Sequence, residues 1–179
     1  MKIFKKIIIL ILILIAIPLV IALFLKKEYA VQREIEINKP KNEVFEYVKY
    51  LKNQDNYSKW NSLYPNMKKT YRGEDGKEGF VSAWESDNDE VGVGEQEIIK
   101  ITEGKRIDFE LRFFKPFEAT EPAFMTTDSI SENQTKVTWG FSGKMNYPMN
   151  IMFLFMDFEQ MIGDDLQLGL TNLKTELEK

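Results

Sequence analysis

Residues 35–45 read IEINKPKNEVF, and within this segment the hydrophobic pattern changes from that of a strand to that of a helix. Residues 31–37 alternate in side-chain character, which predicts a half-buried strand. Pro40 lacks a backbone N–H and is well placed at the first turn of a helix. Apolar residues then recur at helical spacing, at Val44, Phe45, Val48 and Leu51. The segment therefore predicts a strand that is followed at once by a short amphipathic helix.

The rest of the chain is predicted to form an antiparallel sheet and one long helix. Residues 53–60 are expected to form a second short helix or a turn, with Trp60 filling part of the core. Alternating segments predict further strands, at residues 67–72, 80–86, 94–102, 106–114, 119–130 and 135–145. From residue 148 to about 178 the pattern is helical, with an apolar stripe at Ile162, Leu166, Leu170, Leu173 and Leu177. Because a sheet with one apolar face needs a cover, we expect this α+β chain to lay its last helix across the sheet.

The N-terminal segment predicts a membrane anchor. Residues 7–25 contain no charge, amide or hydroxyl, and a helix of this length matches a hydrocarbon core of about 30 Å. The run is longer than that of a cleaved signal peptide, and it ends in Phe24, Leu25, Lys26 and Lys27 without a small-x-small site. We therefore expect residues 1–27 to be an uncleaved transmembrane anchor and residues 28–179 to form the domain. The basic start favours a cytoplasmic N-terminus, with the domain on the outer, periplasmic or extracellular side.

The domain carries a strongly acidic charge. Residues 1–27 hold five lysines, so Lys+Arg falls from 24 to 19 without them while Asp+Glu stays at 28, which leaves a formal charge of −9. Nucleic-acid binding needs clustered basic residues, so no nucleic-acid partner is expected. The same charge should repel anionic headgroups, apart from a collar formed by Lys26 and Lys27.

The chain contains no histidine and no cysteine, which limits its chemistry. These absences exclude Ser-His-Asp triads, Cys-His pairs and ordinary zinc sites. Gly92 and Gly94 lack the further residues of a phosphate-binding loop. The acidic group Asp87, Asp89 and Glu90 lacks the glycine and distal glutamate of a calcium loop, so a solvated turn is expected there. We expect neither a metal nor a cofactor.

The order of these elements resembles the SRPBCC superfamily of START-like and birch-pollen-allergen-like helix-grip proteins, and most closely its bacterial polyketide cyclase/dehydratase branch. Four segments carry the resemblance: residues 35–45, Trp60-Asn61 with Leu63 and Pro65, residues 135–143, and the closing stretch 170–178. The resemblance implies a curved antiparallel sheet of six to seven strands that grips the long helix. It also implies a cavity between them for an apolar or amphipathic ligand. No catalytic residue is carried over, because no catalytic motif defines the superfamily.

Aromatic and methionine side chains are the candidate cavity residues, since they suit an adaptable apolar pocket. The candidates are Trp84, Phe109, Phe113, Phe124, Trp139, Phe141, Met149, Met152, Phe153 and Met156. The alternative is that they only fill the core. Residues 147–156 are apolar nearly all round, which leaves three interpretations: a gate that touches the bilayer, ordinary core, or a dimer contact.

Three functions fit this sequence. The favoured one is a membrane-anchored, non-enzymatic module that holds a hydrophobic small molecule or lipid for sequestration, sensing or transfer. The first alternative is a cyclase/dehydratase-like enzyme that uses a cavity carboxylate or tyrosine. The second alternative is a protein-interaction module with a closed core. The favoured interpretation requires the last thirty residues to lie as one rod over the sheet with apolar space beneath.

Overall fold

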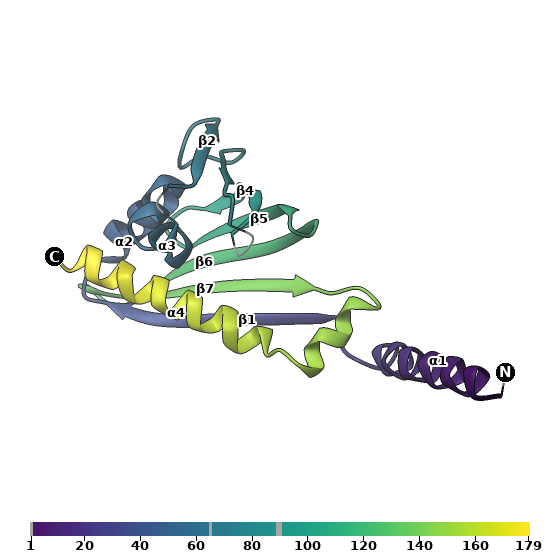
Figure 1. Ribbon diagram of the computed structural model, residues 1–179. Coiled ribbons are helices and arrows are strands. Elements are labelled where there is room, and N and C mark those ends of the chain that lie inside the picture. The colour runs from purple at the N-terminus through teal and green to yellow at the C-terminus, as the bar shows by residue number, and fades with distance from the viewer. Residues whose placement is uncertain (1, 65, 89–90) are drawn as a thin grey trace.

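Seven antiparallel strands form a single sheet in the order β1-β7-β6-β5-β4-β3-β2, as the computed structural model shows (Figure 1). The structure describes residues 2–64, 66–88 and 91–179, so Pro65, Asp89 and Glu90 lie outside the described part. The strands are β1 (Glu28–Ile37), β2 (Lys68–Arg72), β3 (Val81–Glu85), β4 (Val93–Thr102), β5 (Arg106–Lys115), β6 (Ala119–Ser131) and β7 (Gln134–Lys144). The helices are α1 (Lys2–Ala22), α2 (Lys41–Lys49), the 3-10 helix η1 (Leu51–Asn56), α3 (Lys59–Leu63), the 3-10 helix η2 (Met149–Leu154) and α4 (Phe158–Leu177).

The core lies between the concave face of the sheet and the helices α2 and α4. Pairing of β1 with β7 places Ile35 opposite Val137 and Arg33 opposite Trp139. Val137 of β7 and Ile37 of β1 are fully buried. Glu34 and Glu36, which alternate in β1 with the inward-facing residues, lie on the outer face. The alternation predicted for residues 31–37 is therefore the inside–outside pattern of the strand, and α4 packs over this part of the sheet (Figure 1). The seven strands and their long covering helix confirm the predicted helix-grip fold.

The C-terminal helix is shorter than predicted, because residues 148–178 do not form one rod. The chain forms η2, turns at Phe155, and begins α4 at Phe158. Asp157 caps the new helix, since its carboxylate accepts a hydrogen bond of 2.9 Å from the backbone N–H of Gln160. The expected single rod of thirty residues is therefore wrong, and the condition set for the favoured interpretation is not met as stated. The sheet is covered instead by the 20 residues of α4, whose buried side chains include the predicted Leu166, Leu170, Leu173 and Leu177.

Two smaller boundaries also differ from the sequence prediction. Residues 53–60 divide between η1 and α3 instead of forming one element. Strand β1 begins at Glu28, three residues earlier than expected, because Glu28, Tyr29 and Ala30 pair with the end of β7. Only residues 23–27 therefore separate α1 from the sheet.

Helix α1 projects from the end of the sheet at which β1 begins and β7 ends (Figure 1). Its segment Ile3–Ala22 has a mean hydropathy of 2.8 and is long and apolar enough to cross a membrane. Nearly all of its large side chains are exposed, although Ala22, at its last turn, is fully buried. The helix is thus a separate element that touches the domain only at its C-terminal end.

Candidate ligand-binding cavity

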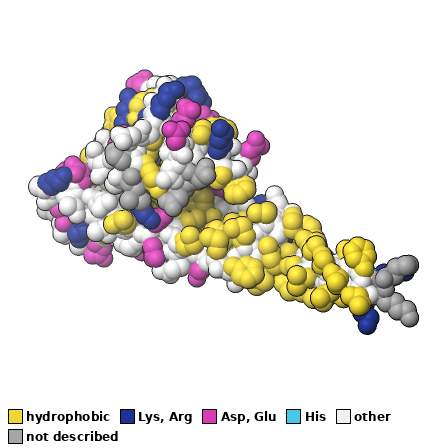
Figure 2. All heavy atoms as spheres, viewed as in Figure 1, with side chains coloured by type: hydrophobic (Ala, Val, Ile, Leu, Met, Phe, Trp, Pro, Cys, Tyr) yellow, Lys and Arg dark blue, Asp and Glu magenta, His cyan; other side chains and the backbone are white. Residues whose placement is uncertain are grey.

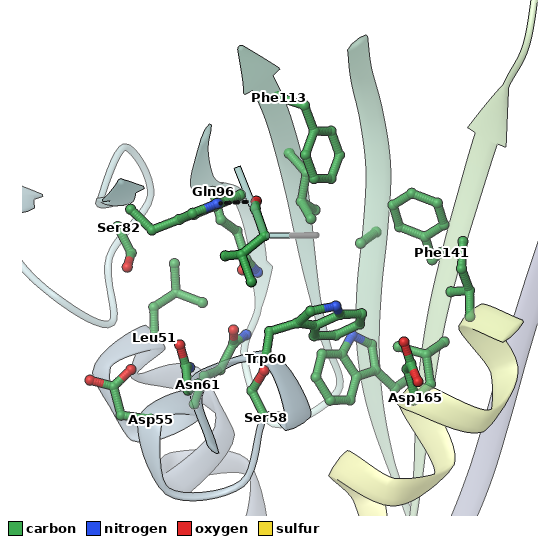
Figure 3. Close-up of a pocket in the computed structure, with 18 of the residues that line it drawn as sticks. Leu51, Asp55, Ser58, Trp60, Asn61, Ser82, Gln96, Phe113, Phe141 and Asp165 are labelled. Carbon is green, nitrogen blue, oxygen red and sulfur yellow. Dashed lines mark hydrogen bonds between the residues drawn. The ribbon is translucent and has the colours of Figure 1, made fainter. Parts of the chain in front are cut away.

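A cavity of about 320 Å³ lies between the concave face of the sheet, the η1–α3 segment and the first half of α4 (Figure 3). This volume is at the lower end of the range for small-molecule sites. Its apolar lining consists of Leu51, Trp60, Met67, Trp84, Val91, Leu111, Phe113, Ala123, Trp139, Phe141, Phe158, Met161, Ile162 and Leu166. Its polar lining consists of Gln54, Asp55, Ser58, Asn61, Lys69, Ser82, Gln96 and Asp165. The cavity is therefore an aromatic chamber with a polar side formed mainly by η1 and α3.

All three tryptophans of the chain line this cavity. Trp84 lies over Gly94 of the neighbouring strand, where an added Cβ would come within 2.5 Å of the indole ring. The Trp84 indole N–H donates a hydrogen bond of 3.2 Å to the Val91 carbonyl, and its ring meets that of Phe113 edge-on at 6.0 Å between centroids. The Trp84 ring is thus fixed on the sheet by a glycine, a hydrogen bond and an aromatic contact.

Trp139 belongs both to the core and to the cavity wall. Its ring meets Tyr57 edge-on at a centroid distance of 5.8 Å, and only 6% of the residue is exposed. Tyr57 is fully buried, and this burial raises the pKa of its hydroxyl well above the ordinary value. On the other side, Gly169 of α4 lies so close that an added Cβ would be 2.8 Å from the Trp139 ring. The rigid packing of Trp139 sets the floor of the cavity.

The polar side of the cavity is built from ion pairs and one buried amide. Lys69 pairs with Asp55 and donates a hydrogen bond of 2.7 Å to Asn61 Oδ1. Across the opening, Lys59 of α3 pairs with Asp165 of α4, which joins the two elements that frame the cavity. Gln54 is buried, and its amide nitrogen forms no well-aligned hydrogen bond among the described residues, although a side-chain interaction of Gln54 with the Tyr57 hydroxyl opposes the rise of that hydroxyl's pKa. A buried donor of this kind can orient a ligand that carries an acceptor.

A second, more open hollow of about 480 Å³ lies at the end of the sheet nearest α1. Tyr29 and Glu121 line it, beside exposed backbone of β1, β6 and β7. Burial raises the pKa of the Tyr29 hydroxyl to about 12, and the nearby Glu121 charge adds to the effect. Burial also raises the pKa of the Glu121 carboxyl, although a hydrogen bond of 2.9 Å from the Lys144 N–H opposes it. The smaller cavity is the better candidate for a ligand site, because it is more enclosed and its walls are aromatic.

Four of the ten predicted cavity residues line the cavity, and six do not. Trp84, Phe113, Trp139 and Phe141 do so. Phe109 is instead fully packed in the core, and Phe124 lies on the outer face of the sheet, under the guanidinium of Arg106 at 4.1 Å. Met149, Met152, Phe153 and Met156 lie in or next to η2, beside α1, because the helix in which they were placed breaks before α4.

The segments η1 and α3 also line the cavity, which the sequence pattern did not predict. Leu51 and Trp60 had been assigned to an amphipathic helix and to the core, but both line the cavity. Gln54, Asp55 and Asn61 give no local signal, because only the tertiary fold turns their segment toward the sheet. No group of three or more acidic side chains that could hold a metal occurs among the residues described, and of the acidic turn only Asp87 belongs to them.

Solved structures with the same fold include the following three. The Aha1 dimer from Colwellia psychrerythraea has a TM-score of 0.57 and 13% identity, and the match covers 84% of this chain and 96% of that one. Ginseng major latex-like protein 151 from Panax ginseng has a TM-score of 0.58 and 16% identity over 86% of this chain and 100% of its own. Ara h 8.0201 has a TM-score of 0.56 and 12% identity over 84% of this chain and 98% of its own.

These likenesses show a shared fold and nothing finer, because the identities are far below those of close relatives. The domain therefore shares the helix-grip fold of these three proteins. No protein-family model matches the sequence, and no curated protein matches it significantly.

Proposed function

We propose that this protein is a membrane-anchored module that binds a hydrophobic small molecule or lipid in the cavity between the sheet and α4. The observation that carries the proposal is the aromatic cavity of about 320 Å³, lined by all three tryptophans and provided with a few polar groups. Apolar burial would drive binding at about 25 cal/mol per Å². The helix-grip fold supports this role, since the resemblance implies a cavity for such ligands.

The anchor is the second part of the proposal. Helix α1 supplies an apolar span, and Lys26 and Lys27 follow it after the three apolar residues 23–25. Residues 1–27 would act as the anchor and residues 28–179 as the binding domain. With a cytoplasmic N-terminus the domain would lie on the outer, periplasmic or extracellular side. A short tether of this kind would keep a bound ligand close to the lipid surface.

Tryptophan fluorescence tests ligand binding directly, because every tryptophan lines the cavity. The full-length protein, reconstituted in phosphatidylcholine nanodiscs, is titrated with 9,10-dibromostearic acid, whose bromines quench indole on contact. Unbrominated stearic acid controls for effects other than quenching. We expect saturable quenching by the brominated acid alone, and competition by excess stearic acid. Quenching that is absent, or that rises linearly with the brominated acid in the bilayer, would contradict the proposal.

A pair of matched variants separates cavity binding from effects at the surface. Ala123 lines the cavity, so Ala123→Leu should fill part of it and weaken the saturable quenching at least tenfold. Ala83 lies next to Trp84 in β3 and does not line the cavity, so Ala83→Leu should leave quenching unchanged. If Ala123→Leu and Ala83→Leu changed the saturable quenching equally, the dibromostearic acid would be binding outside the cavity.

An enzymatic use of the cavity is the second candidate, and two cavity carboxylates give it a specific basis. Asp55 lies 3.5 Å from the Tyr71 hydroxyl, and Asp165 is largely buried at the opening. Both carboxylates, however, form ion pairs with lysines, which favours a role in shaping the opening. Native mass spectrometry of the detergent-extracted protein, with chromatography of the released ligand, distinguishes the two. A co-purifying lipid unchanged in mass and retention time supports binding. Its conversion on incubation to a dehydrated product of lower mass, or to a cyclised isomer of equal mass and different retention time, supports catalysis.

A further inference from the structure

The segment between β7 and α4 exposes an unusual amount of apolar surface. Tyr147, Met149, Leu154 and Phe155 are 44%, 47%, 51% and 82% exposed, respectively. Soluble surfaces rarely carry such a contiguous group without a partner. In Figure 2 hydrophobic side chains form a band that runs from α1 onto the adjoining part of the domain. The apolar surface of η2 thus continues that of the anchor.

Asn150 fixes this segment to the end of α1. Its side chain is fully buried, and its amide donates a hydrogen bond of 2.7 Å to the Ala22 carbonyl and a longer one of 3.4 Å to that of Leu25. The last carbonyls of a helix have no hydrogen-bond donor within the helix. The Asn150 amide supplies one and so stabilises the C-terminal end of α1, which matters most where the surroundings offer little water. Because of this contact, η2 lies beside the last turn of α1.

Charged side chains lie next to this apolar segment, just beyond the C-terminal end of α1. Lys26 forms an ion pair of 2.5 Å with Glu159 at the start of α4, and its ammonium lies 5.3 Å from the centre of the Phe153 ring. Lysines and aromatic rings are typical of the interface at the ends of transmembrane helices. Two further aromatic rings, those of Phe24 and Phe155, are largely exposed in the segments that follow α1 and η2, and Phe24 is 84% exposed. The order from α1 to the domain is therefore apolar, then aromatic, then charged.

We propose that residues 147–155 form a second membrane contact, which inserts Met149, Leu154 and Phe155 into the interface of the bilayer that α1 spans. This proposal rests on the anchoring role of α1 proposed above. Phe158 and Met161, which line the cavity, follow this segment directly at the start of α4. The α1-facing end of the cavity then lies beside the lipid surface, so a lipid-derived ligand enters from the bilayer. The acidic domain keeps a fixed orientation instead of swinging on its tether.

Site-directed spin labelling tests the contact, because the chain contains no cysteine of its own. A nitroxide is attached to Phe155→Cys in the full-length protein, reconstituted in vesicles of phosphatidylcholine with phosphatidylglycerol. Ile13→Cys, within the span, and Ile130→Cys, at the far end of the sheet, are the matched controls. Power saturation compares accessibility to oxygen, which concentrates in lipid, with accessibility to a water-soluble nickel chelate. We expect the label at 155 to give a depth between those at 13 and 130, with oxygen accessibility above that to nickel.

Each other result overturns the proposal in a distinct way. Nickel accessibility at 155 equal to that at 130, with 13 still deep, would remove the interfacial contact and leave the anchor standing. High nickel accessibility of the label at residue 13 would contradict both the membrane anchor and the second membrane contact. Low accessibility of 155 to both reagents, with dipolar broadening between labels, would show that a second copy of the chain covers the segment instead of lipid.

Discussion

Gln54 belongs to the polar side of the cavity, and its effect on stability can be measured separately from its effect on ligand binding. Its buried amide nitrogen has a side-chain interaction with the Tyr57 hydroxyl but no well-aligned hydrogen bond in the described part of the chain, and a buried donor without a good partner costs about 1–3 kcal/mol. Gln54→Met keeps the length of the side chain and removes the amide. We expect the variant to unfold with a free energy about 1 kcal/mol higher than that of the native protein, as measured by urea denaturation.

The same substitution should weaken binding of ligands that carry an acceptor. Binding of stearic acid, measured by competition with its dibromo derivative, should weaken by up to tenfold in Gln54→Met. Binding of octadecane, which has no acceptor, should not weaken. A loss of both affinities would instead identify Gln54 as a packing residue of the cavity wall.

Two buried glutamates should respond to pH with opposite signs. Burial alone would raise the pKa of Glu95, but hydrogen bonds from Arg72 and Arg112, at 2.9 and 2.7 Å, outweigh it, so that this pKa lies below the ordinary 4.5. The folded state therefore favours the charged form of Glu95. Its stabilisation is present above pH 4.5 and is lost as the pH falls through the lowered pKa. Glu95→Gln should lower the free energy of unfolding by about 2 kcal/mol at pH 7, and the difference should shrink in acid.

Glu121→Gln is the counterpart with the opposite sign. Because the pKa of Glu121 is raised in the folded protein, first by burial, the folded state disfavours its charged form. The charged carboxylate therefore reduces stability above its folded pKa, and protonation removes this cost as the pH falls. Glutamine keeps the acceptor for the Lys144 N–H, so Glu121→Gln should raise the free energy of unfolding at pH 7 and match the native protein at pH 3. Urea denaturation at the two pH values measures both variants, and an equal response of the two would refute the assignment.

At the scale of single residues, the sequence predicted that Phe109 and Phe113 point to the same side of β5, but not which of them lines a cavity. The parity of Phe109 and Phe113 in β5 is the same, yet Phe109 is packed in the core and Phe113 lines the cavity. The difference arises because α3 and η1 cover only part of the strand, and their position depends on contacts distant in sequence. Phe124 was misplaced for another reason: its neighbours Ala123 and Met125 are both buried, so its own parity is outward.

At the scale of elements, two glycines in α4 distinguish a flexible neighbour from a rigid one. An added Cβ at Gly163 would meet the end of the Arg33 side chain at 2.1 Å, whereas at Gly169 it would meet the Trp139 ring at 2.8 Å. Alanine is favoured over glycine in a helix by about 1 kcal/mol. The Arg33 guanidinium can move aside, so Gly163→Ala should raise the free energy of unfolding by up to that amount.

The Trp139 ring is held between Tyr57 and α4, so Gly169→Ala should have the opposite effect. Overpacking of a rigid core costs about 1–3 kcal/mol, which exceeds the gain in helix propensity. Thermal denaturation followed by circular dichroism measures both variants. If Gly169→Ala proved as stable as Gly163→Ala, Trp139 would have room to move into the cavity, and its ring would not be a fixed floor.

The long helix also shows where periodicity was insufficient. The stripe from Leu166 to Leu177 was correct, because residues at three- and four-residue spacing face the sheet. Residues 147–156 are apolar nearly all round, with Asn150 as the exception, so their pattern could not distinguish a continuing helix from a 3-10 turn. The contact of Asn150 with Ala22 joins residues that are 128 positions apart, and no local pattern predicts it.

At the scale of the whole molecule, α1 and the domain are joined by few contacts, although they share one surface. The core cluster of buried residues contains no side chain from α1, and its members run from Val31 to Leu177. The domain should therefore fold without its anchor. Residues 28–179, expressed alone, should give a cooperative urea transition whose midpoint lies close to that of the full-length protein in mild detergent.

The truncated chain should also expose the part of the domain surface that α1 covers. Loss of α1 uncovers Asn150 and leaves Met149, Leu154 and Phe155 exposed to water, so the domain should bind phosphatidylcholine vesicles weakly through this segment. Leu154→Ser combined with Phe155→Ser should abolish sedimentation with vesicles while leaving the urea midpoint unchanged, because both side chains are largely exposed. A truncated chain that fails to fold would show that the boundary at residue 28 is wrong. One that folds but never binds vesicles would show that α1 alone holds the domain at the membrane.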